Sequence, residues 1–541
     1  MNFNSIIIRN SLYYASEEMG IALRNSAYSP NIKERMDHSA AIFDSEGRLL
    51  AQAEHIPVHL GSLPVGLKNT LDFMQRESME FRKGDMVVVN NPYIAGTHLN
   101  DVTLIRPVFF EDELVAFVAN KAHHSDIGGR VPGSISMDAE SIFEEGLIVN
   151  PVYLMRDNEF REDVISIFSA NSRNPYERKG DLRAQAAANF TGERRILEIL
   201  RKYGLMEFRN SSQDLFEYSL RLFLDGMKRF REGSYKGEDY IELDGEDIRL
   251  SVNIEIREGN VYVDYNGTST QVRSPLNAVL GVTVSGVHYV FRTLMGENIP
   301  VNYGTFSRIH IQVPEGTVLN PTFPSPVAGG NVETSQRNAD VIYLALSGAA
   351  PDIVPAASGG SMNNVMVGGV HSGRTWAFYE TIGVGTGGRK GMDGIDGIHA
   401  NMTNTMNTPI EEIEKNYPLM IVKYEFREGS SGMGEFRGGN GLIRAYRALD
   451  KMTFTILSDR MRHRPYGLLG GECGAPTDII IRKGKSKIKG RSKITVELMP
   501  GDYVEIRTAG GGGYGDKSRR SIERIMEDIE NGLIKKGKVQ R

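Results

Sequence analysis

The chain has 541 residues, and 63 Lys and Arg residues against 68 Asp and Glu residues give a formal net charge of −5. This length allows two or more domains, and so small a charge argues against nucleic acid or a membrane surface as the partner. No apolar run approaches the ~20 residues of a transmembrane helix, and the N-terminus carries charge early and lacks a signal-cleavage pattern. The single cysteine, Cys473, excludes an internal disulfide and is typical of a reducing cytoplasm. We therefore expect a cytoplasmic globular protein, with many tight turns because 59 residues are Gly.

The first quarter of the chain is expected to alternate helices with strands. An amphipathic helix is predicted over Phe3–Tyr28, a hairpin pairs His38–Phe43 with Arg48–Ala53, and a second helix runs from about Ser62 to Arg82. Clustering of histidines indicates that this quarter builds a site, although a structural role stays open for any single one. Six of the eleven histidines lie here: His38, His55, His59, His98, His123 and His124.

A second hairpin is predicted between residues 101 and 123. Asp101–Phe110 and Leu114–His123 are rich in Val, Ile, Leu and Phe, and a short acidic turn separates them. Folding brings the two open ends of this hairpin together. Ionisable residues at these ends therefore converge without any assumption about the rest of the fold.

The converging residues have the chemistry of a metal site. Asp101 would face His123 or His124, and His98 lies in the loop that leads into the same end. Such a set suits Mn, Zn, Fe or Co with open coordination positions. Adjacent strand residues point to opposite faces, so only one of the two neighbouring histidines can join directly; we predict His98, Asp101 and His124 as the ligands. The alternative to a metal site is a solvent-exposed hairpin end whose histidines only form hydrogen bonds with the backbone.

Helices are expected to follow this hairpin. Ser166–Asn174 is expected to end a β-like segment, and Pro175 then opens a long helix over Tyr176–Tyr203. Arg183 lies among alanines in that helix, as do other polar residues, which suggests packing against something polar or a plain surface helix. A further helix spans about Asp214–Gly233.

The remainder of the chain is expected to be rich in strands and glycine. Strands alternate from about Gly237, a helix-like stretch covers Ala278–Met295, and a loop over Pro321–Arg337 carries Asn331 and Glu333. This loop and the glycine-rich residues 358–397 could line a substrate pocket, because Gly lets backbone N–H groups approach a ligand, or they could be flexible surface. Residues 419–507 are predicted to form strands with Gly-rich turns.

Two motifs that suggest nucleotides or nucleic acid fail on inspection. The basic run Arg482–Lys493 alternates with Ser, Ile and Gly without aromatic residues, which favours a solvated hairpin. Gly510–Gly515 satisfies GxGxxG, but too little chain follows for the second strand of a βαβ unit. It also fails Walker A, because Asp516 intervenes before Lys517. We expect a tight Gly turn packed against the core and no nucleotide site in this chain.

The predicted elements define an α+β fold. An N-terminal α/β region bearing the hairpin site would cover residues 1–235, a mixed glycine-rich pocket region 236–418, and a β-rich region with a C-terminal helix 419–541.

Several ordered motifs resemble the hydantoinase B/oxoprolinase family over essentially the whole chain. That family includes the B-type subunits of N-methylhydantoinases, the C-terminal half of 5-oxoprolinases and the alpha subunits of acetone carboxylases. The motifs are Asp37–Asp44, Glu54–Gly61, Asn90–Asp101, Ala122–Gly129, Gly180–Gln185, Gly267–Gln271 and Gly510–Asp516.

The resemblance implies an ATP-dependent system of two components. A separate hydantoinase A-type subunit with an actin-like ATPase fold would bind ATP and phosphorylate the carbonyl oxygen of a cyclic amide, and this chain would act on the activated intermediate. A hetero-oligomer follows, with a dimer of heterodimers as one arrangement. In the carboxylase branch a His-x-x-Asp and a later His hold a metal, which matches His98, Asp101 and His124 here.

Ring opening needs a positioned water and a base. Asp37 and His59 are our candidates for the base and for proton transfer. Residues predicted to contact the substrate or support these groups are Glu54, His123, Arg183, Asn331 and Glu333.

Three functions are consistent with these residues and with the resemblance. The first is a hydrolase subunit that opens 5-oxoproline, hydantoin or a similar lactam, which the chain length favours. The second is the alpha subunit of an acetone carboxylase-like enzyme, and the third a noncatalytic scaffold for the ATPase. Bicarbonate dependence separates the first two.

Overall fold

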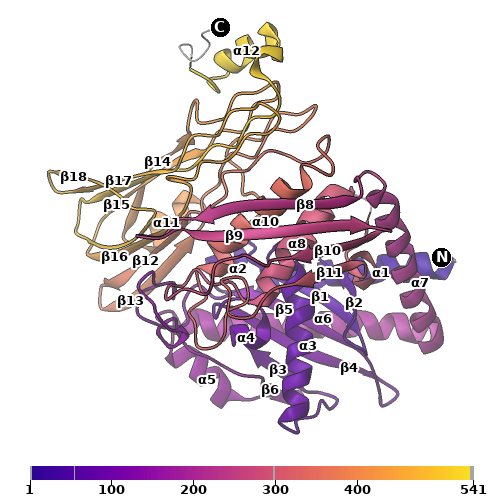
Figure 1. Ribbon diagram of the computed structural model, residues 1–541. Coiled ribbons are helices and arrows are strands. Elements are labelled where there is room, and N and C mark those ends of the chain that lie inside the picture. Colours follow the sequence, from indigo (N-terminus) through magenta and orange to yellow (C-terminus); the bar gives the residue numbers. More distant parts are fainter. Residues whose placement is uncertain (1–2, 54, 297–298, 536–541) are drawn as a thin grey trace.

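A seven-stranded sheet dominates the N-terminal part of the computed structural model, which describes residues 3–53, 55–296 and 299–535 (Figure 1). Its strand order is β2-β1-β5-β4-β3-β6-β7, with all pairs antiparallel. The strands are β1 (His38–Asp44), β2 (Leu49–Gln52), β3 (Met86–Val89), β4 (Asp101–Phe110), β5 (Glu113–His123), β6 (Val152–Arg156) and β7 (Glu159–Phe160).

Helices cover both faces of this sheet because its strands alternate side chains between the faces. Ala40 and Ile42 of β1 pack on one face with α1 (Phe3–Ser26) and α6 (Pro175–Tyr203). Phe43, on the other face, packs with α3. The remaining helices of this part are α2 (Pro30–Lys33), α3 (His59–Arg76), α4 (Pro92–Ala95), α5 (Glu162–Ala170) and α7 (Leu205–Met227), with a 3-10 turn at Ile142–Glu144.

A four-stranded sheet and two buried helices form the central part. The strand order is β11-β10-β9-β8, with β10 and β11 parallel, and the long strands β8 and β9 cross the middle of Figure 1. The largest apolar cluster combines this sheet with α8 and α10 and reaches back to Leu99. The elements are β8 (Gly233–Ile241), β9 (Ile248–Arg257), β10 (Asn260–Asp264), β11 (Ile309–Gln312), α8 (Leu280–Met295), α9 (Tyr303–Phe306) and α10 (Ser335–Leu346).

Two further sheets form the C-terminal part, with a third cluster of apolar side chains between them. Their orders are β13-β12-β16-β19 and β14-β15-β20-β17-β18. The strands are β12 (Asn364–His371), β13 (Arg374–Glu380), β14 (Leu419–Phe426), β15 (Leu442–Ala448), β16 (Met452–Leu457), β17 (Asp478–Lys483), β18 (Ser486–Lys489), β19 (Lys493–Leu498) and β20 (Tyr503–Arg507). The helices are α11 (Ile410–Asn416), α12 (Ile522–Glu530) and a 3-10 turn, Lys517–Arg519.

The Gly510–Gly515 segment packs directly against other backbone, as predicted. A Cβ at Gly511 would lie 1.8 Å from the carbonyl oxygen of Thr386, and one at Gly513 would lie 2.1 Å from that of Met433. The N–H of Gly511 donates to the carbonyl of Gly439 at 2.9 Å. Only glycine permits backbone approach this close, so the motif is used for packing.

The predicted α+β class is confirmed, but two local predictions are wrong. Residues 166–170 belong to helix α5, because Ile165 and Phe168 pack on the sheet at helical spacing. The loop predicted over Pro321–Arg337 ends in a π-helical turn, Gly330–Thr334, that continues into α10. The long helix predicted at Ser62–Arg82 is α3 and begins three residues earlier, at His59.

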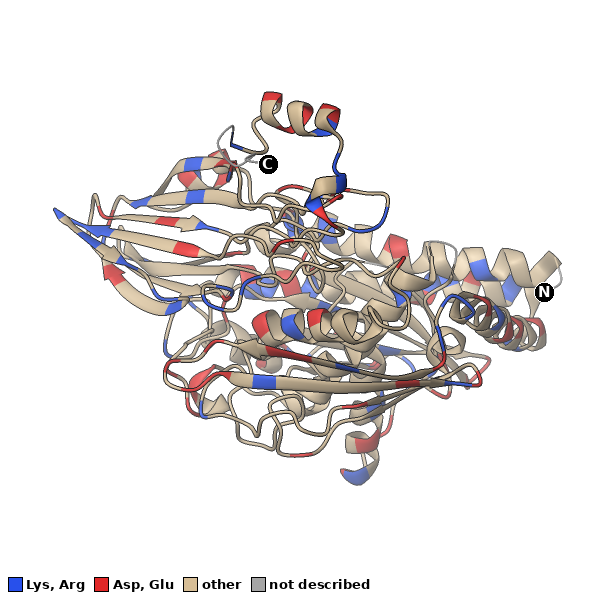
Figure 2. Cartoon of the chain, turned by 45° about the horizontal axis from the view of Figure 1, so that its top comes forward, with Lys and Arg blue, Asp and Glu red and all other residues tan. Residues whose placement is uncertain are grey.

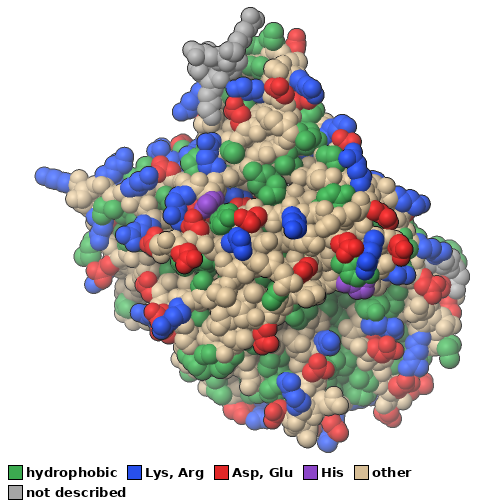
Figure 3. Space-filling model, in the orientation of Figure 1, with side chains coloured by type: hydrophobic (Ala, Val, Ile, Leu, Met, Phe, Trp, Pro, Cys, Tyr) green, Lys and Arg blue, Asp and Glu red, His purple; other side chains and the backbone are tan. Residues whose placement is uncertain are grey.

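Charges of both signs are spread over all parts of the chain (Figure 2) and intersperse with apolar side chains on the face shown in Figure 3. Within the described ranges, no helix is long and apolar enough to cross a membrane.

Helix α8 fixes the start of α3, and therefore the position of His59. The backbone N–H groups of Gly61 and Ser62 both donate to Oγ of Ser285 at 2.9 Å, which satisfies two donors that a helix start leaves unpaired. The two helices approach closely here, since a Cβ at Gly61 of α3 would lie 2.7 Å from the backbone nitrogen of Ser285 in α8.

We predict that Gly61→Ala lowers the free energy of unfolding by about 1–3 kcal/mol, because the added methyl meets the backbone of Ser285, which cannot move aside. Denaturant unfolding monitored by circular dichroism measures this change. Lys68→Ala, at an exposed position of α3, is the control and should change stability by less than about 0.5 kcal/mol. Equal stability of the two variants would contradict the tight helix crossing.

Candidate metal centre

The open end of the β4–β5 hairpin carries three side chains that point at one another. Asp101 pairs with His123 in the register of the hairpin, and His98 lies in the preceding loop. Oδ1 of Asp101 lies 3.1 Å from Nε2 of His98 and 3.2 Å from Nδ1 of His123, and those two nitrogens are 3.1 Å apart. The three side chains are at most 3% exposed.

The register corrects the predicted choice between the two neighbouring histidines. His123, not His124, faces Asp101, and the alternation of the strand sends His124 to the opposite face. There His124 contacts Oε1 of Gln185 on α6 at 2.9 Å. Nε2 of Gln185 donates to the backbone carbonyl of Val102, so Oε1 of Gln185 accepts a hydrogen bond from Nε2 of His124. Burial holds the pKa of His124 well below its usual range, so this residue stays neutral.

The backbone fixes the orientation of His98. Its Nδ1 lies 3.1 Å from the carbonyl oxygen of Ala328 and must donate, which leaves the lone pair of Nε2 directed at the cluster. Metal-binding histidines commonly donate their second nitrogen in this way. Burial lowers the pKa of His98, but the charge of Asp101 and the hydrogen bonds outweigh it and raise the pKa overall.

The second oxygen of Asp101 is held by two further residues. Nε2 of His59 and Nδ2 of Asn331 each lie 3.3 Å from Oδ2. Nε2 of His59 faces a carboxylate oxygen and therefore carries the proton of the neutral ring, so Nδ1 accepts from Oγ of Ser39 at 2.9 Å. Burial would raise the pKa of Asp101, but the charge of His98 and the histidine hydrogen bonds hold it well below its usual range.

This arrangement fits a divalent metal. Bonds of about 2.1 Å at right angles place neighbouring ligand atoms about 3.0 Å apart, close to the 3.1–3.2 Å spacing of the three donor atoms. His98, Asp101 and His123 are the group in the described chain whose donor atoms converge in this way. Nitrogen and carboxylate donors suit Mn, Zn, Fe or Co, and the metal itself stays a prediction.

Other predicted residues surround this centre. The carbonyl of Asp37 accepts from the N–H of His123 at 3.0 Å, and its carboxylate lies 3.4 Å from Asn31. Glu333, on the π-helical turn with Asn331, contacts Nδ2 of Asn364 at 3.0 Å, and burial raises the pKa of Glu333 to about 8.

Two predicted residues are not placed at the centre. Arg183 is exposed and pairs with Glu162 at 2.7 Å, because α6 directs Gln185, two residues later, toward the hairpin instead. Glu54 lies outside the described residues.

Sequence reasoning missed an aromatic residue and a carboxylate near the centre. Tyr379 of β13 stacks on His123, with ring centroids 4.7 Å apart, and its hydroxyl donates to Asn364 at 2.9 Å. Glu145 is fully buried and accepts hydrogen bonds from the N–H groups of Val327 and Ala328, each at 2.9 Å. Neither stood out in the sequence, because the ring on which Tyr379 stacks and the backbone that Glu145 binds are each more than 180 residues away.

With this geometry described, comparisons identify the family. The chain matches the hydantoinase B/oxoprolinase family over residues 2–517, and it therefore belongs to that family, as the motifs predicted.

Among its relatives, an uncharacterized protein of Methanocaldococcus jannaschii is 48% identical over 98% of this chain and 93% of its own length. A 5-oxoprolinase of Saccharomyces cerevisiae is 37% identical over 92% of this chain. A protein named as the B-type subunit of a D-/L-hydantoinase, from a Pseudomonas species, is 32% identical over 98% of this chain and 93% of its own. The chain spans only 40% of the yeast enzyme, so the activity of that whole protein cannot be transferred directly.

Two solved structures share the fold. An ATP-dependent caprolactamase from Pseudomonas jessenii superposes with a TM-score of 0.91 at 29% identity, covering 98% of this chain and 94% of its own. A nucleotide-free acetone carboxylase gives a TM-score of 0.90 over 98% of this chain and 78% of its own. At 19% identity the second likeness shows the fold alone.

We predict that His98→Ala and His123→Ala each abolish stoichiometric metal binding, because each removes one of three converging donors. His124→Ala serves as the matched control and should keep its metal, since that ring faces Gln185. Elemental analysis of the purified variants measures the bound metal. Loss of metal from His124→Ala alone would make His124 the ligand in place of His123.

We further predict that Glu145→Ala lowers the metal affinity by about 10–100-fold, the usual effect of losing an outer hydrogen-bonding partner. Removing the carboxylate frees the Val327–Ala328 backbone, whose carbonyl orients His98. Glu145→Gln, which keeps one acceptor oxygen, should be milder. Competition with a chelator measures the affinities, and Glu144→Ala, next to it and partly exposed, is the control. Equal affinities for Glu145→Ala and Glu144→Ala would show that the backbone needs no such anchor.

Proposed function

We propose that this chain is the B-type subunit of an ATP-dependent cyclic-amide hydrolase of the 5-oxoprolinase or N-methylhydantoinase type. The buried His98, Asp101 and His123 set is the observation that carries the proposal, since a noncatalytic scaffold has no need of it. The 5-oxoprolinase and hydantoinase relatives, and the caprolactamase neighbour, all have names that refer to cyclic amides.

A partner supplies the ATP chemistry in this proposal. The chain offers no nucleotide motif, and its GxGxxG segment is packed against backbone. We assign ATP binding and phosphorylation of the substrate carbonyl oxygen to a hydantoinase A-type subunit in a cytoplasmic hetero-oligomer. Water then attacks the carbon that bears the phosphorylated oxygen and gives up a proton to the base, the C–N bond of the ring breaks, and the ring nitrogen takes up a proton. The resulting acyl phosphate reacts with a second water, which releases inorganic phosphate and the free carboxylate.

The residues of this chain have distinct roles in that step. His98, Asp101 and His123 would hold a divalent ion, which supplies Lewis acidity when bound. Asp37 is the candidate base, because it neighbours His123 and its carboxylate has one side-chain hydrogen bond among the described contacts, from Asn31 at 3.4 Å. We assign His59 and Asn331 to holding Oδ2 of Asp101 in place, because both contact it.

We predict that Asp101→Asn lowers ATP-dependent hydrolysis of the cyclic amide by more than 100-fold when the chain is assayed with its A-type partner. The substitution removes the negative charge of the metal site. ATP hydrolysis by the partner should persist, and chromatography of the ring-opened product follows the reaction. The acetone carboxylase-like alternative predicts that wild-type turnover requires bicarbonate, so a bicarbonate requirement would overturn the hydrolase assignment.

A further inference from the structure

The metal centre is sealed from solvent, so a substrate must reach it through a neighbouring cavity. Its three donor side chains are at most 3% exposed. Side-chain contacts connect it to a cavity of about 420 Å³, which is within the 300–1,000 Å³ range usual for small-molecule sites. Residues from several distant segments line this cavity, including Pro57, Tyr289, Tyr343, Arg389, His399 and Ala400.

Contacts connect the wall of this cavity to the surroundings of the metal centre. Pro57 lines it, two residues before the His59 that contacts Asp101. His399 also lines it, and its Nδ1 lies 3.4 Å from Oγ1 of Thr381, which Arg35 contacts at 2.8 Å.

Further side-chain contacts continue from Arg35 toward the metal centre. The guanidinium of Arg35 lies 4.8 Å from the ring centroid of Tyr379, and this ring stacks on His123. Thr381, Arg35 and Tyr379 therefore form a chain of contacts from His399, in the cavity wall, to His123, a proposed ligand.

The lining suits a small ring with a hydrogen-bonding carbonyl. Tyr289 and Tyr343 lie edge to face with their ring centroids 6.5 Å apart, and the hydroxyl of Tyr343 lies 2.6 Å from that of Thr293. Burial raises the pKa of Tyr289 to about 12, so its hydroxyl remains a donor at neutral pH. Pro57 and Leu294 supply apolar surface against which a ring can pack.

One cation of this cavity is available to a ligand. Arg389 is exposed, and among the described residues its guanidinium donates one hydrogen bond, to the sulfur of Met392 at 2.9 Å. The neighbouring Lys390 is instead paired with Asp352 at 2.8 Å. A guanidinium without a protein carboxylate is suited to binding a carboxylate on a ligand.

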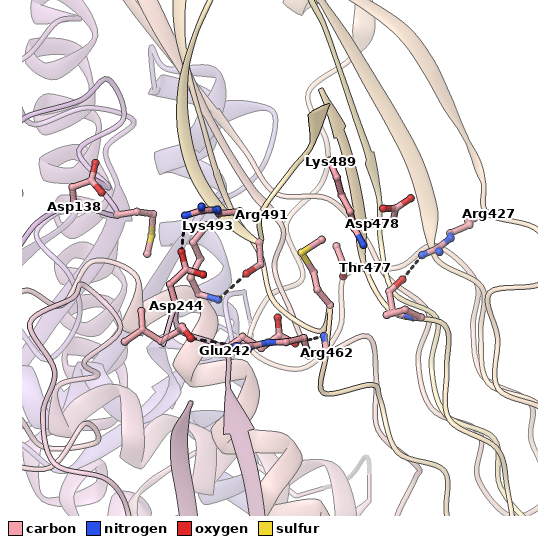
Figure 4. A pocket seen from close by; sticks show the side chains of 15 residues that line it. Asp138, Glu242, Asp244, Arg427, Arg462, Thr477, Asp478, Lys489, Arg491 and Lys493 are labelled. Carbon is pink, nitrogen blue, oxygen red and sulfur yellow. Dashed lines mark hydrogen bonds and ion pairs between the residues drawn. The ribbon is translucent and has the colours of Figure 1, made fainter. Parts of the chain in front are cut away.

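In a second cavity, by contrast, arginines are already bound by the protein. It measures about 700 Å³ and lies between the end of β8 and the C-terminal sheets (Figure 4). Two of its arginines already have protein partners: Arg491 pairs with Asp244 at 2.9 Å, and Arg427 donates to the carbonyl of Pro476 at 2.6 Å.

We propose that the 420 Å³ cavity is an access subsite for a small cyclic amide that bears a carboxylate, with the carboxylate bound by Arg389 and the ring near Tyr289 and Tyr343. This inference rests on the proposed function and adds a substrate preference, for an anionic lactam over the same ring without its carboxylate.

The test compares L-5-oxoproline with 2-pyrrolidinone, which is the same ring without the carboxylate. Binding of each probe to the full metal-loaded chain is measured by calorimetry or ligand-observed NMR. Arg389→Ala should weaken 5-oxoproline at least tenfold and 2-pyrrolidinone less than twofold. Lys390→Ala, the adjacent cation, should change neither by more than twofold. Equal effects of the two substitutions on 5-oxoproline would overturn the role of Arg389.

A cavity-filling variant tests the location. Ala400→Trp should abolish binding of both probes, and Leu71→Trp, which lines a separate cavity of about 560 Å³, should not. If Ala400→Trp fails to fold, Ile398→Trp, which is 40% exposed and also lines the cavity, replaces it. Undiminished binding in the filled, folded variant would overturn the proposal.

Metal content measured on the same samples distinguishes failure of the access subsite from failure of the metal centre. A metal-loaded wild type that binds neither probe would contradict the access subsite alone. A metal-free wild type that still binds 5-oxoproline in a manner sensitive to Arg389→Ala would contradict the metal centre alone.

Discussion

The carboxylate of Asp101 is the group on which the site depends. A buried charge without partners is costly, and this one is compensated by His98 and His123 on one oxygen and by His59 and Asn331 on the other. These partners come from a loop, β5, α3 and the π-helical turn. Holding one carboxylate therefore requires the N-terminal sheet and the central helices to pack in a single arrangement.

A second layer of buried polar contacts orients the residues around Asp101. Ser39 donates to Nδ1 of His59, and Ala328, held by Glu145, sets the tautomer of His98. Gln185 occupies the other face of the hairpin end and binds His124. Because buried donors and acceptors need partners, each of these contacts limits how the hairpin end can move, which is what a site of defined geometry requires.

The spacing of apolar residues predicted helices and strands well where its periodicity was strong. It predicted them less well where packing against distant elements decided the secondary structure. The strands Asp101–Phe110 and Ile248–Arg257 and the helix ending at Tyr203 form as expected. Helix α5 was missed because it is only nine residues long and its packing partners lie on β3 and β4. Within the site, convergence at the hairpin end followed from spacing alone, whereas the wrong histidine was chosen because register depends on the bulge near Val108 and Phe109.

The sequence by itself determined the hairpin, the family and the types of donor available to a metal. Those follow from residue chemistry and from short-range geometry, in which strand alternation and turn length place nearby residues together. The tertiary structure alone decided that His123 joins the cluster, that Arg183 stays at the surface, and that Glu145 and Tyr379 support the centre. Their contacts join segments far apart in the chain, and such contacts are set by the packing of whole elements and leave no local pattern to read.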